Sequence, residues 1–262
     1  MTEPAELIIE DVERIRVLRL DRPHRRNALS TSLSRAIVDA VAATIDDVDV
    51  WAVVLTGTGT EAFCAGMDLK EAHERERDGT DASRSPVPSL GPGVFQAVQM
   101  LPMPTIAAIN GTAVAGGLEL ALACDVRICA DHAQLGMPEV RRGLVGNFAA
   151  TVLPRLIPAS LASEMLFTGQ SIDAATAYRC GLVNRVTSAD DVLPCALALA
   201  RSICENAPIA VRRTKARSRA GAILPVEMAY RLDLGPDPRL SADRAEGIAA
   251  FVEKRPPRWR NE

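Results

Sequence analysis

The 262-residue sequence lacks several common patterns, and each absence excludes a class of protein. No apolar run approaches the roughly 20 residues that a membrane-spanning helix needs. No basic block suits a nucleic acid or an anionic membrane, because the net charge is −3 and both signs are mixed along the chain. The first residues, MTEPAELIIED, lack the charged-then-apolar pattern of a secretory signal. We therefore expect a cytoplasmic protein that binds neither nucleic acid nor membrane.

Metal-binding and disulfide patterns are also missing. The three histidines are scattered, and the cysteines have no CxxC spacing and lie mostly in apolar surroundings. This pattern predicts no metal site and reduced cysteines in the core of a cytosolic protein. The cysteines are Cys64, Cys124, Cys129, Cys180, Cys195 and Cys204.

The first part of the chain alternates strand and helix patterns. Leu7–Asp21 alternates apolar and polar residues around a polar centre, which predicts a β-hairpin. A helix capped near Ser30 or Thr31 should follow, since apolar residues then recur every four positions. Trp51–Thr56 is continuously apolar, which is typical of a strand covered on both faces in a parallel sheet.

The last third of the chain is helical in pattern. Helices are predicted over Gly146–Ile157, Leu161–Thr168, Asp173–Cys180, Ala189–Glu205, Pro208–Ala220, Pro225–Leu232 and Ser241–Lys254, with a short strand at Val183–Val186. A hydrophobic content of 48% suffices for one sizeable core. We predict an α/β fold with a β/α core over residues 1–195 and a helical region over residues 196–262.

The most informative stretch is Pro104–Glu139. It predicts a strand (Thr105–Asn110), a glycine-rich turn (Gly111–Gly117), a helix (Leu118–Cys124) and a second strand (Val126–Cys129). The first N–H groups of a helix have no partner within it and favour negative charge. A carboxylate beside such an apolar helix is partly buried, which raises its pKa and suits it to proton transfer. Glu119 in the helix and Glu139 at the end of the unit thus predict carbonyl chemistry.

Two glycine-containing segments give weaker evidence for a ligand-binding function. Gly57–Ala62 matches the dinucleotide-binding pattern G-x-G-x-x-A, but the next residues, FCAGMD, do not open a long helix. Gly79–Gly93 is rich in proline and glycine without periodicity, which predicts a mobile loop that either covers a ligand or is an ordinary surface loop.

Several motifs in order resemble the crotonase superfamily, also called the enoyl-CoA hydratase/isomerase family. They are AINGTAVAGGLELALACDVRICADHAQLGMPE, EAFCAGMDLKE, RPHRRNAL, AYRCGLVNRV and FVEKRPPRW, and together they cover nearly the whole chain. The resemblance implies a crotonase-like spiral of ββα units with a C-terminal helical trimerisation region, in a homotrimer or a dimer of trimers. The sequence itself shows no repeat.

The resemblance also implies a reaction. Crotonase-like enzymes bind acyl-CoA thioesters and need no cofactor, because coenzyme A is part of the substrate. The backbone N–H groups of Met67 and Gly116 match the oxyanion hole that holds the thioester oxygen. Glu119 and Glu139 match the two glutamates that add water across the double bond of a 2-enoyl-CoA, Glu119 mainly as base and Glu139 as the proton donor to C2. The reverse reaction dehydrates a 3-hydroxyacyl-CoA.

Coenzyme A contacts are implied by the same motifs. A basic residue near CoA matches Arg25 or Arg26, and Lys254 resembles a residue that reaches CoA, sometimes across a subunit boundary. The remaining candidates for the CoA and substrate contacts are Ala28, Ala65, Asp68, Leu69 and Lys70.

Departures from the family pattern leave the acyl substrate open. Ala115 replaces a glycine common in that turn, and Asn147 and Phe148 are expected to alter the wall of the acyl pocket. The chain from Met165 onward also resembles carnitinyl-CoA dehydratases. Two alternatives remain: a Δ3,Δ2-enoyl-CoA isomerase, for which one carboxylate suffices, and a non-catalytic acyl-CoA-binding homologue.

Overall fold

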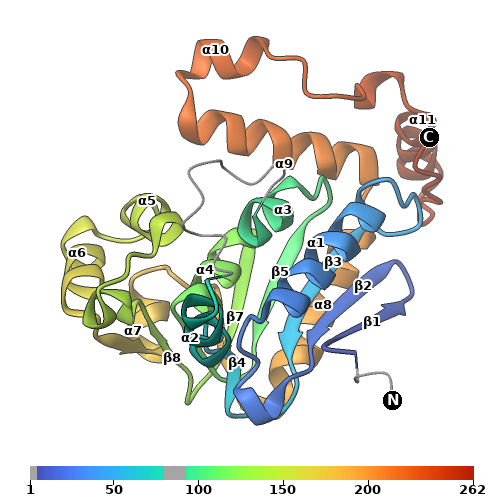
Figure 1. Cartoon of the computed structure of the whole chain (residues 1–262). Coiled ribbons are helices and arrows are strands. Elements are labelled where there is room, and N and C mark those ends of the chain that lie inside the picture. Colours follow the sequence, from blue (N-terminus) through green and yellow to red (C-terminus); the bar gives the residue numbers. More distant parts are fainter. Residues whose placement is uncertain (1–4, 80–92) are drawn as a thin grey trace.

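The chain folds into two β-sheets surrounded by helices, as seen in a computed structural model that describes residues 5–79 and 93–262 (Figure 1). The larger sheet has the strand order β1-β2-β3-β5-β7-β10 and the smaller sheet the order β4-β6-β8-β9. The larger sheet contains β1 (Leu7–Val12), β2 (Ile15–Leu20), β3 (Ala52–Gly57), β5 (Thr105–Ile109), β7 (Val126–Ala130) and β10 (Arg185–Thr187). The smaller sheet contains β4 (Ala62–Cys64), β6 (Thr112–Val114), β8 (Gln134–Gly136) and β9 (Ser171–Asp173).

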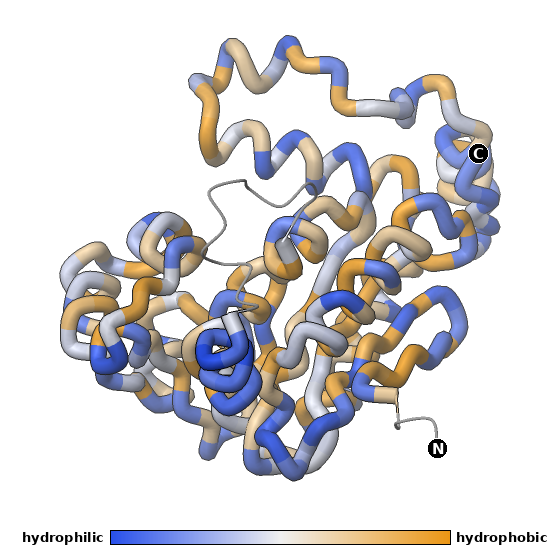
Figure 2. Tube along the Cα trace, viewed as in Figure 1, coloured by the Kyte–Doolittle hydropathy of each residue, from blue (hydrophilic) through white to orange (hydrophobic). Residues whose placement is uncertain are grey.

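The larger sheet forms the core of the molecule. β1 and β2 make the predicted antiparallel hairpin, and the strands from β2 to β10 run parallel. Every residue of β3 and β5 is buried, as expected for parallel strands covered on both faces. Figure 2 shows these strands as mostly hydrophobic segments in the centre of the fold. Burial raises the pKa of the Cys64, Cys124 and Cys129 thiols to about 12, so these cysteines are inert core residues.

Each turn of the chain through the core places one strand in each sheet. β3 and β4, then β5 and β6, then β7 and β8 repeat this step, and helices follow each pair. This is the spiral of ββα units that the family resemblance implied. Each strand of the smaller sheet has only three residues, too few to show alternation, which explains why none of the four was predicted.

Helices cover the core and form the site. They are α1 (Thr31–Ile45), α2 (Leu69–Arg77), α3 (Val94–Met100), α4 (Gly116–Ala123), α5 (Asn147–Leu156), α6 (Ala159–Thr168), α7 (Ala174–Arg179) and α8 (Val192–Cys204). Ser30 caps α1 as predicted, accepting a hydrogen bond from Leu33 N at 2.9 Å. No helix in the described ranges is long and apolar enough to span a bilayer.

Three local predictions were wrong. The glycine-rich turn at Gly111–Gly117 contains β6, and α4 begins at Gly116 rather than Leu118. The strand predicted at Val183–Val186 is β10, two residues later. Sequence patterns locate element ends poorly, because local tertiary contacts decide where a strand or helix stops. By contrast, the expectation that no helix opens after the dinucleotide-like pattern at Gly57–Ala62 is confirmed, because strand β4 begins there.

The C-terminal helices extend away from the sheets. α9 (Pro208–Ile223), α10 (Val226–Arg231) and α11 (Ala242–Glu253) form this extension (Figure 1). α8 packs on β3, β5 and β7, so the expected boundary after residue 195 falls inside a core helix.

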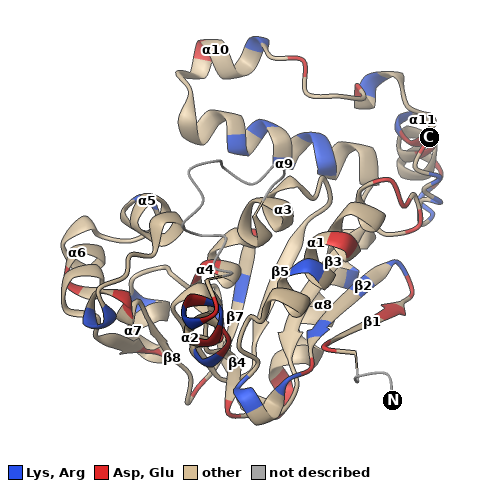
Figure 3. Ribbon diagram, in the orientation of Figure 1, with Lys and Arg blue, Asp and Glu red and all other residues tan. Residues whose placement is uncertain are grey.

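Charged side chains join α9 to the core. Basic side chains recur along this helix (Figure 3). Two of them, Lys215 and Arg219, pair with Asp125 at 2.6 Å and 2.7 Å. Asp125 also accepts a hydrogen bond from Thr105 N at 2.8 Å, at the start of β5. The C-terminal extension is thereby held against the starts of β5 and β7, two interior strands of the larger sheet.

Candidate active site

The ends of β4 and β6 meet where α4 begins. A β-carbon placed on Gly117 would lie 1.9 Å from Cys64 O, so only glycine allows the backbone at the end of β4 to pack on this helix. A β-carbon on Gly66 would lie 3.0 Å from Gly116 N, and Gly66 has a φ of +85°. Gly66 and Gly116 are therefore direct neighbours, and Met67 follows at once.

Two backbone N–H groups are available at this junction. Leu29 N donates to Gly66 O at 2.7 Å and Asp68 N donates to Leu29 O at 2.9 Å. In this parallel bridge between Leu29 and Met67, the N–H of Met67 itself points away from Leu29. Gly116 is the first residue of α4, so its N–H has no partner in the helix. The hydrogen bonds among the described residues use neither N–H.

Ala115 precedes this helix in a conformation that favours glycine. Its φ is 54° and its ψ is −132°, which costs a residue with a β-carbon on the order of 1–3 kcal/mol. Ala115 N donates to Gly136 O at 2.9 Å, which ties this residue to β8. The turn thus keeps its shape although the sequence departs from glycine here.

Glu119 lies one turn into α4 and is 6% exposed. Its Oε1 accepts a hydrogen bond at 2.9 Å from Ala149 N, in the first turn of α5. Burial raises the pKa of this carboxyl, and the charge of Glu139 raises it further, although N–H groups of Ala149 and Phe148 oppose both effects. The first turn of α5 therefore orients a carboxylate whose pKa stays above its ordinary value.

Glu139 projects from a short 3₁₀ helix, η3 (Pro138–Arg142), and is partly buried. Burial raises the pKa of its carboxyl, while its own backbone N–H and the charge of Arg142 oppose this rise. Its Oε2 is buried and has no hydrogen-bond partner among the described residues. A buried polar atom without a partner is rare, and a water or substrate atom would satisfy it.

The two carboxylates converge beside Gly146. A β-carbon placed on Gly146 would lie 3.0 Å from Glu139 Oε1 and 3.2 Å from Glu119 Oε1. Both oxygens thus approach one point, and a larger residue at 146 would push between them. The structure brings together the two glutamates that the sequence singled out.

All of these groups open into one cavity of about 550 Å³. The site residues on its wall include Ala65, Met67, Gly116, Glu119 and Glu139. The rest of the wall is mostly apolar or hydroxyl-bearing: Leu29, Ser30, Thr31, Ser34, Leu69, Arg75, Val94, Phe95, Val114, Ala115, Pro138, Arg142, Leu144 and Val145.

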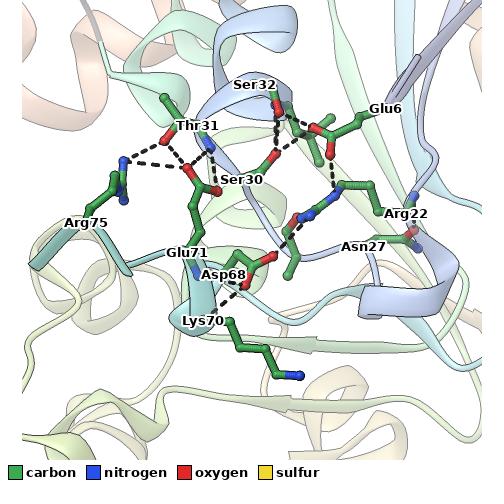
Figure 4. A network of polar contacts seen from close by, with 12 residues as sticks. Glu6, Arg22, Asn27, Ser30, Thr31, Ser32, Asp68, Lys70, Glu71 and Arg75 are labelled. Carbon is green, nitrogen blue, oxygen red and sulfur yellow. Dashed lines mark hydrogen bonds and ion pairs between the residues drawn. The ribbon is translucent and has the colours of Figure 1, made fainter. Parts of the chain in front are cut away.

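A buried arginine supports the loop that carries Met67 (Figure 4). Arg22 is 9% exposed and pairs through Nε with Glu6 at 2.6 Å and through Nη2 with Asp68 at 3.0 Å. Its Nη1 donates to Ala28 O at 2.7 Å. One guanidinium therefore holds both Ala28 and Asp68, on the two backbone segments that meet at the Leu29–Met67 bridge.

Asp68 has a structural task in this loop. Its carboxylate caps α2, accepting from Lys70 N at 3.2 Å and Glu71 N at 3.4 Å. Burial opposes ionisation, but the hydrogen bonds from Arg22 and Glu71 N keep the pKa of this carboxyl below its usual value.

The other predicted CoA residues lie at different distances from the cavity. Leu69 and Ala65 line it. Lys70 is exposed on α2, and Arg25 is exposed in a 3₁₀ helix, η1 (Pro23–Arg25). Lys254 directly follows α11, which lies across the molecule from α2 (Figure 1). Their contacts with coenzyme A stay predictions.

The expected role of Asn147 and Phe148 in the pocket wall differs from what is observed. Neither residue is on the cavity wall, which is formed there by Leu144 and Val145. Phe148 lies behind Phe95, with the ring centroids 5.7 Å apart. Most of the predicted loop Gly79–Gly93 (residues 80–92) lies outside the described residues.

Sequence reasoning missed three elements of the site: Arg22, Gly146 and Arg142. Arg22 stands in the RPHRRNAL motif, which was the available signal, but its partners come from distant segments. In the described segments, no group of three or more His, Cys, Asp or Glu side chains has metal-site geometry.

The β/α spiral places Met67, Gly116 and the two carboxylates on the wall of one cavity, an arrangement suited to acid–base chemistry next to a polarised carbonyl. The sequence profile of the enoyl-CoA hydratase/isomerase family matches residues 10–262. This chain belongs to that family.

Individual relatives match over nearly the full length. The chain is 36% identical over 252 residues to a crotonyl-CoA hydratase of Syntrophomonas wolfei, covering 95% of both chains. It is 39% identical over 251 residues to a carnitinyl-CoA dehydratase of Salmonella arizonae, covering 92% of this chain and 93% of the relative. A crystal structure of an enoyl-CoA hydratase from Mycobacterium tuberculosis superposes with a TM-score of 0.86 at 34% identity, covering 99% of this chain and 100% of the other.

Proposed function

We propose that this enzyme adds water to a 2-enoyl-CoA to form a 3-hydroxyacyl-CoA and catalyses the reverse dehydration. The observation that carries the proposal is the approach of Glu119 Oε1 and Glu139 Oε1 to one point beside Gly146. Two carboxylates at such a point can hold one water between them. The names of the relatives, crotonyl-CoA hydratase and carnitinyl-CoA dehydratase, support the same reaction in its two directions.

The backbone amides of Met67 and Gly116 form the oxyanion hole in this proposal. When water attacks C3, negative charge moves to the thioester oxygen. Both N–H groups border the cavity, and neither is used by another described residue. Removal of one such donor typically slows an enzyme by about 10²–10³-fold. The amides therefore stabilise the enolate that forms between attack at C3 and protonation at C2.

The glutamates move the protons. Glu119, ionised and held by Ala149 N–H, takes a proton from the water as its oxygen bonds to C3. Glu139 in its protonated form delivers a proton to C2. Burial raises the pKa of both carboxyls, which brings them closer to the neutral range in which proton transfer is efficient.

Hydration of crotonyl-CoA tests this proposal. We expect loss of enone absorbance when enzyme is added, and uptake of one oxygen atom into the product in heavy-oxygen water. A 3-enoyl-CoA supplied in the same water separates the isomerase alternative, whose product would carry no label. Binding of crotonyl-CoA without turnover would favour a non-catalytic homologue and contradict the proposal.

The C-terminal helices provide the assembly surface in this proposal. Large apolar side chains are exposed along α10 and α11 and next to them, which is unusual for a monomer. They are Ile223, Val226, Met228, Tyr230, Leu240, Ile248, Phe251 and Val252. We expect a trimer or a dimer of trimers by light scattering, and a monomer at micromolar concentration would contradict this. Lys254, remote from its own cavity, would then be free to reach coenzyme A on a neighbouring subunit.

A further inference from the structure

One charged group in the cavity moves no proton in the proposed hydration, although its charge opposes the rise in the pKa of Glu139. Arg142 lines the cavity at the end of η3. In a 3₁₀ helix the side chains at positions i and i+3 eclipse, so Arg142 lies on the same face as Glu139. Its Nη1 is 3.5 Å from Pro138 O, and Pro138 is also on the cavity wall. The guanidinium therefore lies beside the cavity.

Arg142 differs from the other cation on this wall. Arg75 donates to Thr31 Oγ1 at 2.5 Å and lies 3.8 Å from Glu71 Oε1. By contrast, the ion pairs formed among residues 5–79 and 93–262 do not include Arg142. An arginine carries five N–H donors in a planar fork that matches a carboxylate. Apart from the 3.5 Å contact of Nη1 with Pro138 O, the N–H donors of Arg142 form no hydrogen bond within the described residues and remain available to a ligand.

Leu144 and Val145, on the segment that follows Arg142, form an apolar part of the same wall. The carboxylates of Glu119 and Glu139 would repel an anionic acyl group unless a cation compensated for them. Arg142 supplies that cation, one 3₁₀ turn beyond Glu139. The guanidinium of Arg142 would repel a cationic acyl end.

We propose that Arg142 recognises a carboxylate at the acyl end of the substrate, so that this enzyme hydrates an enoyl-CoA derived from a dicarboxylic acid. The inference rests on the proposed hydratase function and adds the substrate class. The chemistry is unchanged: water oxygen bonds to C3, a proton is added to C2, and the distal carboxylate takes no part. The preference is opposite to that needed for a carnitinyl group, which carries a quaternary ammonium.

Three thioesters that differ only in the group on C4 test the proposal. Crotonyl-CoA is neutral there, glutaconyl-CoA carries a carboxylate, and crotonobetainyl-CoA carries a trimethylammonium. A hydrogen-bonded ion pair at this site predicts a kcat/KM for glutaconyl-CoA about 10–100-fold above that for crotonyl-CoA. Crotonobetainyl-CoA should be the poorest substrate.

The variant Arg142→Gln should remove most of the preference for glutaconyl-CoA, measured as the ratio of kcat/KM for glutaconyl-CoA to kcat/KM for crotonyl-CoA. Arg141→Gln is the matched control. Arg141 is adjacent and equally charged, but its Nε donates to Thr168 O at 2.9 Å, on α6 and away from the cavity. The ratio of the two kcat/KM values should not change in this control. An equal fall in kcat/KM for all three substrates in Arg142→Gln would assign Arg142 to the hydration step and overturn the proposal.

Binding separates failure of this inference from failure of the hydratase function. Calorimetry with the Glu119→Gln, Glu139→Gln variant measures the affinity for glutaconyl-CoA and crotonyl-CoA without turnover. Tighter binding of glutaconyl-CoA that depends on Arg142 supports the inference even if no thioester is hydrated. Equal affinities, or a preference that survives Arg142→Gln, would refute it even if crotonyl-CoA is hydrated.

Discussion

The double variant Glu119→Gln, Glu139→Gln is expected to lose hydration of crotonyl-CoA almost completely. Each general acid or base typically raises the catalytic rate about 10²–10⁴-fold. The effects of residues that act together are not additive, so the rate of the double variant should be close to that of the less active single variant. The loss should appear in kcat, because glutamine keeps the shape of the site. Loss of enone absorbance measures the rate. Glu164→Gln, an exposed position on α6, is the control, and full activity of the double variant would end the assignment.

Stability separates loss of chemistry from loss of fold in this variant. Burial raises the pKa of both carboxyls in the folded protein above the value in the unfolded chain. The folded state therefore binds more protons between these two values, and stability falls as pH rises through that window. Above that window, the ionised carboxyls cost the folded state stability. We expect the double variant to unfold at the same or a higher urea concentration than wild type, and unfolding at a lower concentration would contradict this account of the site.

Arg22→Gln is expected to destabilise the protein strongly and to slow hydration. The change leaves the carboxylates of Glu6 and Asp68 without their shared guanidinium. Removal of one partner from a buried ion pair typically costs about 3–5 kcal/mol. Ala28 O also loses its donor, so the segment that aims the Met67 N–H is held less firmly. Urea unfolding measures the first effect and kcat for crotonyl-CoA the second.

Arg35→Gln provides the comparison for Arg22. Arg35 is 84% exposed on α1 and lies 3.9 Å from Asp39, and exposed pairs of this kind contribute about 0–1 kcal/mol. Its replacement should change neither stability nor rate appreciably. If Arg22→Gln behaved like Arg35→Gln, the network in Figure 4 would not position the loop.

Much of the fold was accessible from local patterns. The hairpin over Leu7–Asp21, the helix capped by Ser30 and the buried strand β3 follow from periodicity and capping, which operate over a few residues. The spiral was not accessible in that way. Its smaller sheet is made of three-residue strands whose pairing depends on distant partners, and it was expected from the family resemblance alone.

The candidate site shows the same division. Glu119, Glu139 and the N–H of Gly116 were identified from the motifs that contain them. The hydrogen bond from Ala149 to Glu119 joins residues 30 positions apart, and the ion pair of Arg22 with Asp68 spans 46 positions. Neither could be read from a local pattern.

The sequence alone established the kind of chemistry, because that depends on which side chains are present and on the short motifs that contain them. Only the tertiary structure decided that Glu119 and Glu139 approach one point, that Arg22 holds the Met67 loop, and that Arg142 shares the cavity. These are distances between segments far apart in the chain, and they are set by packing of the whole core rather than by any local preference.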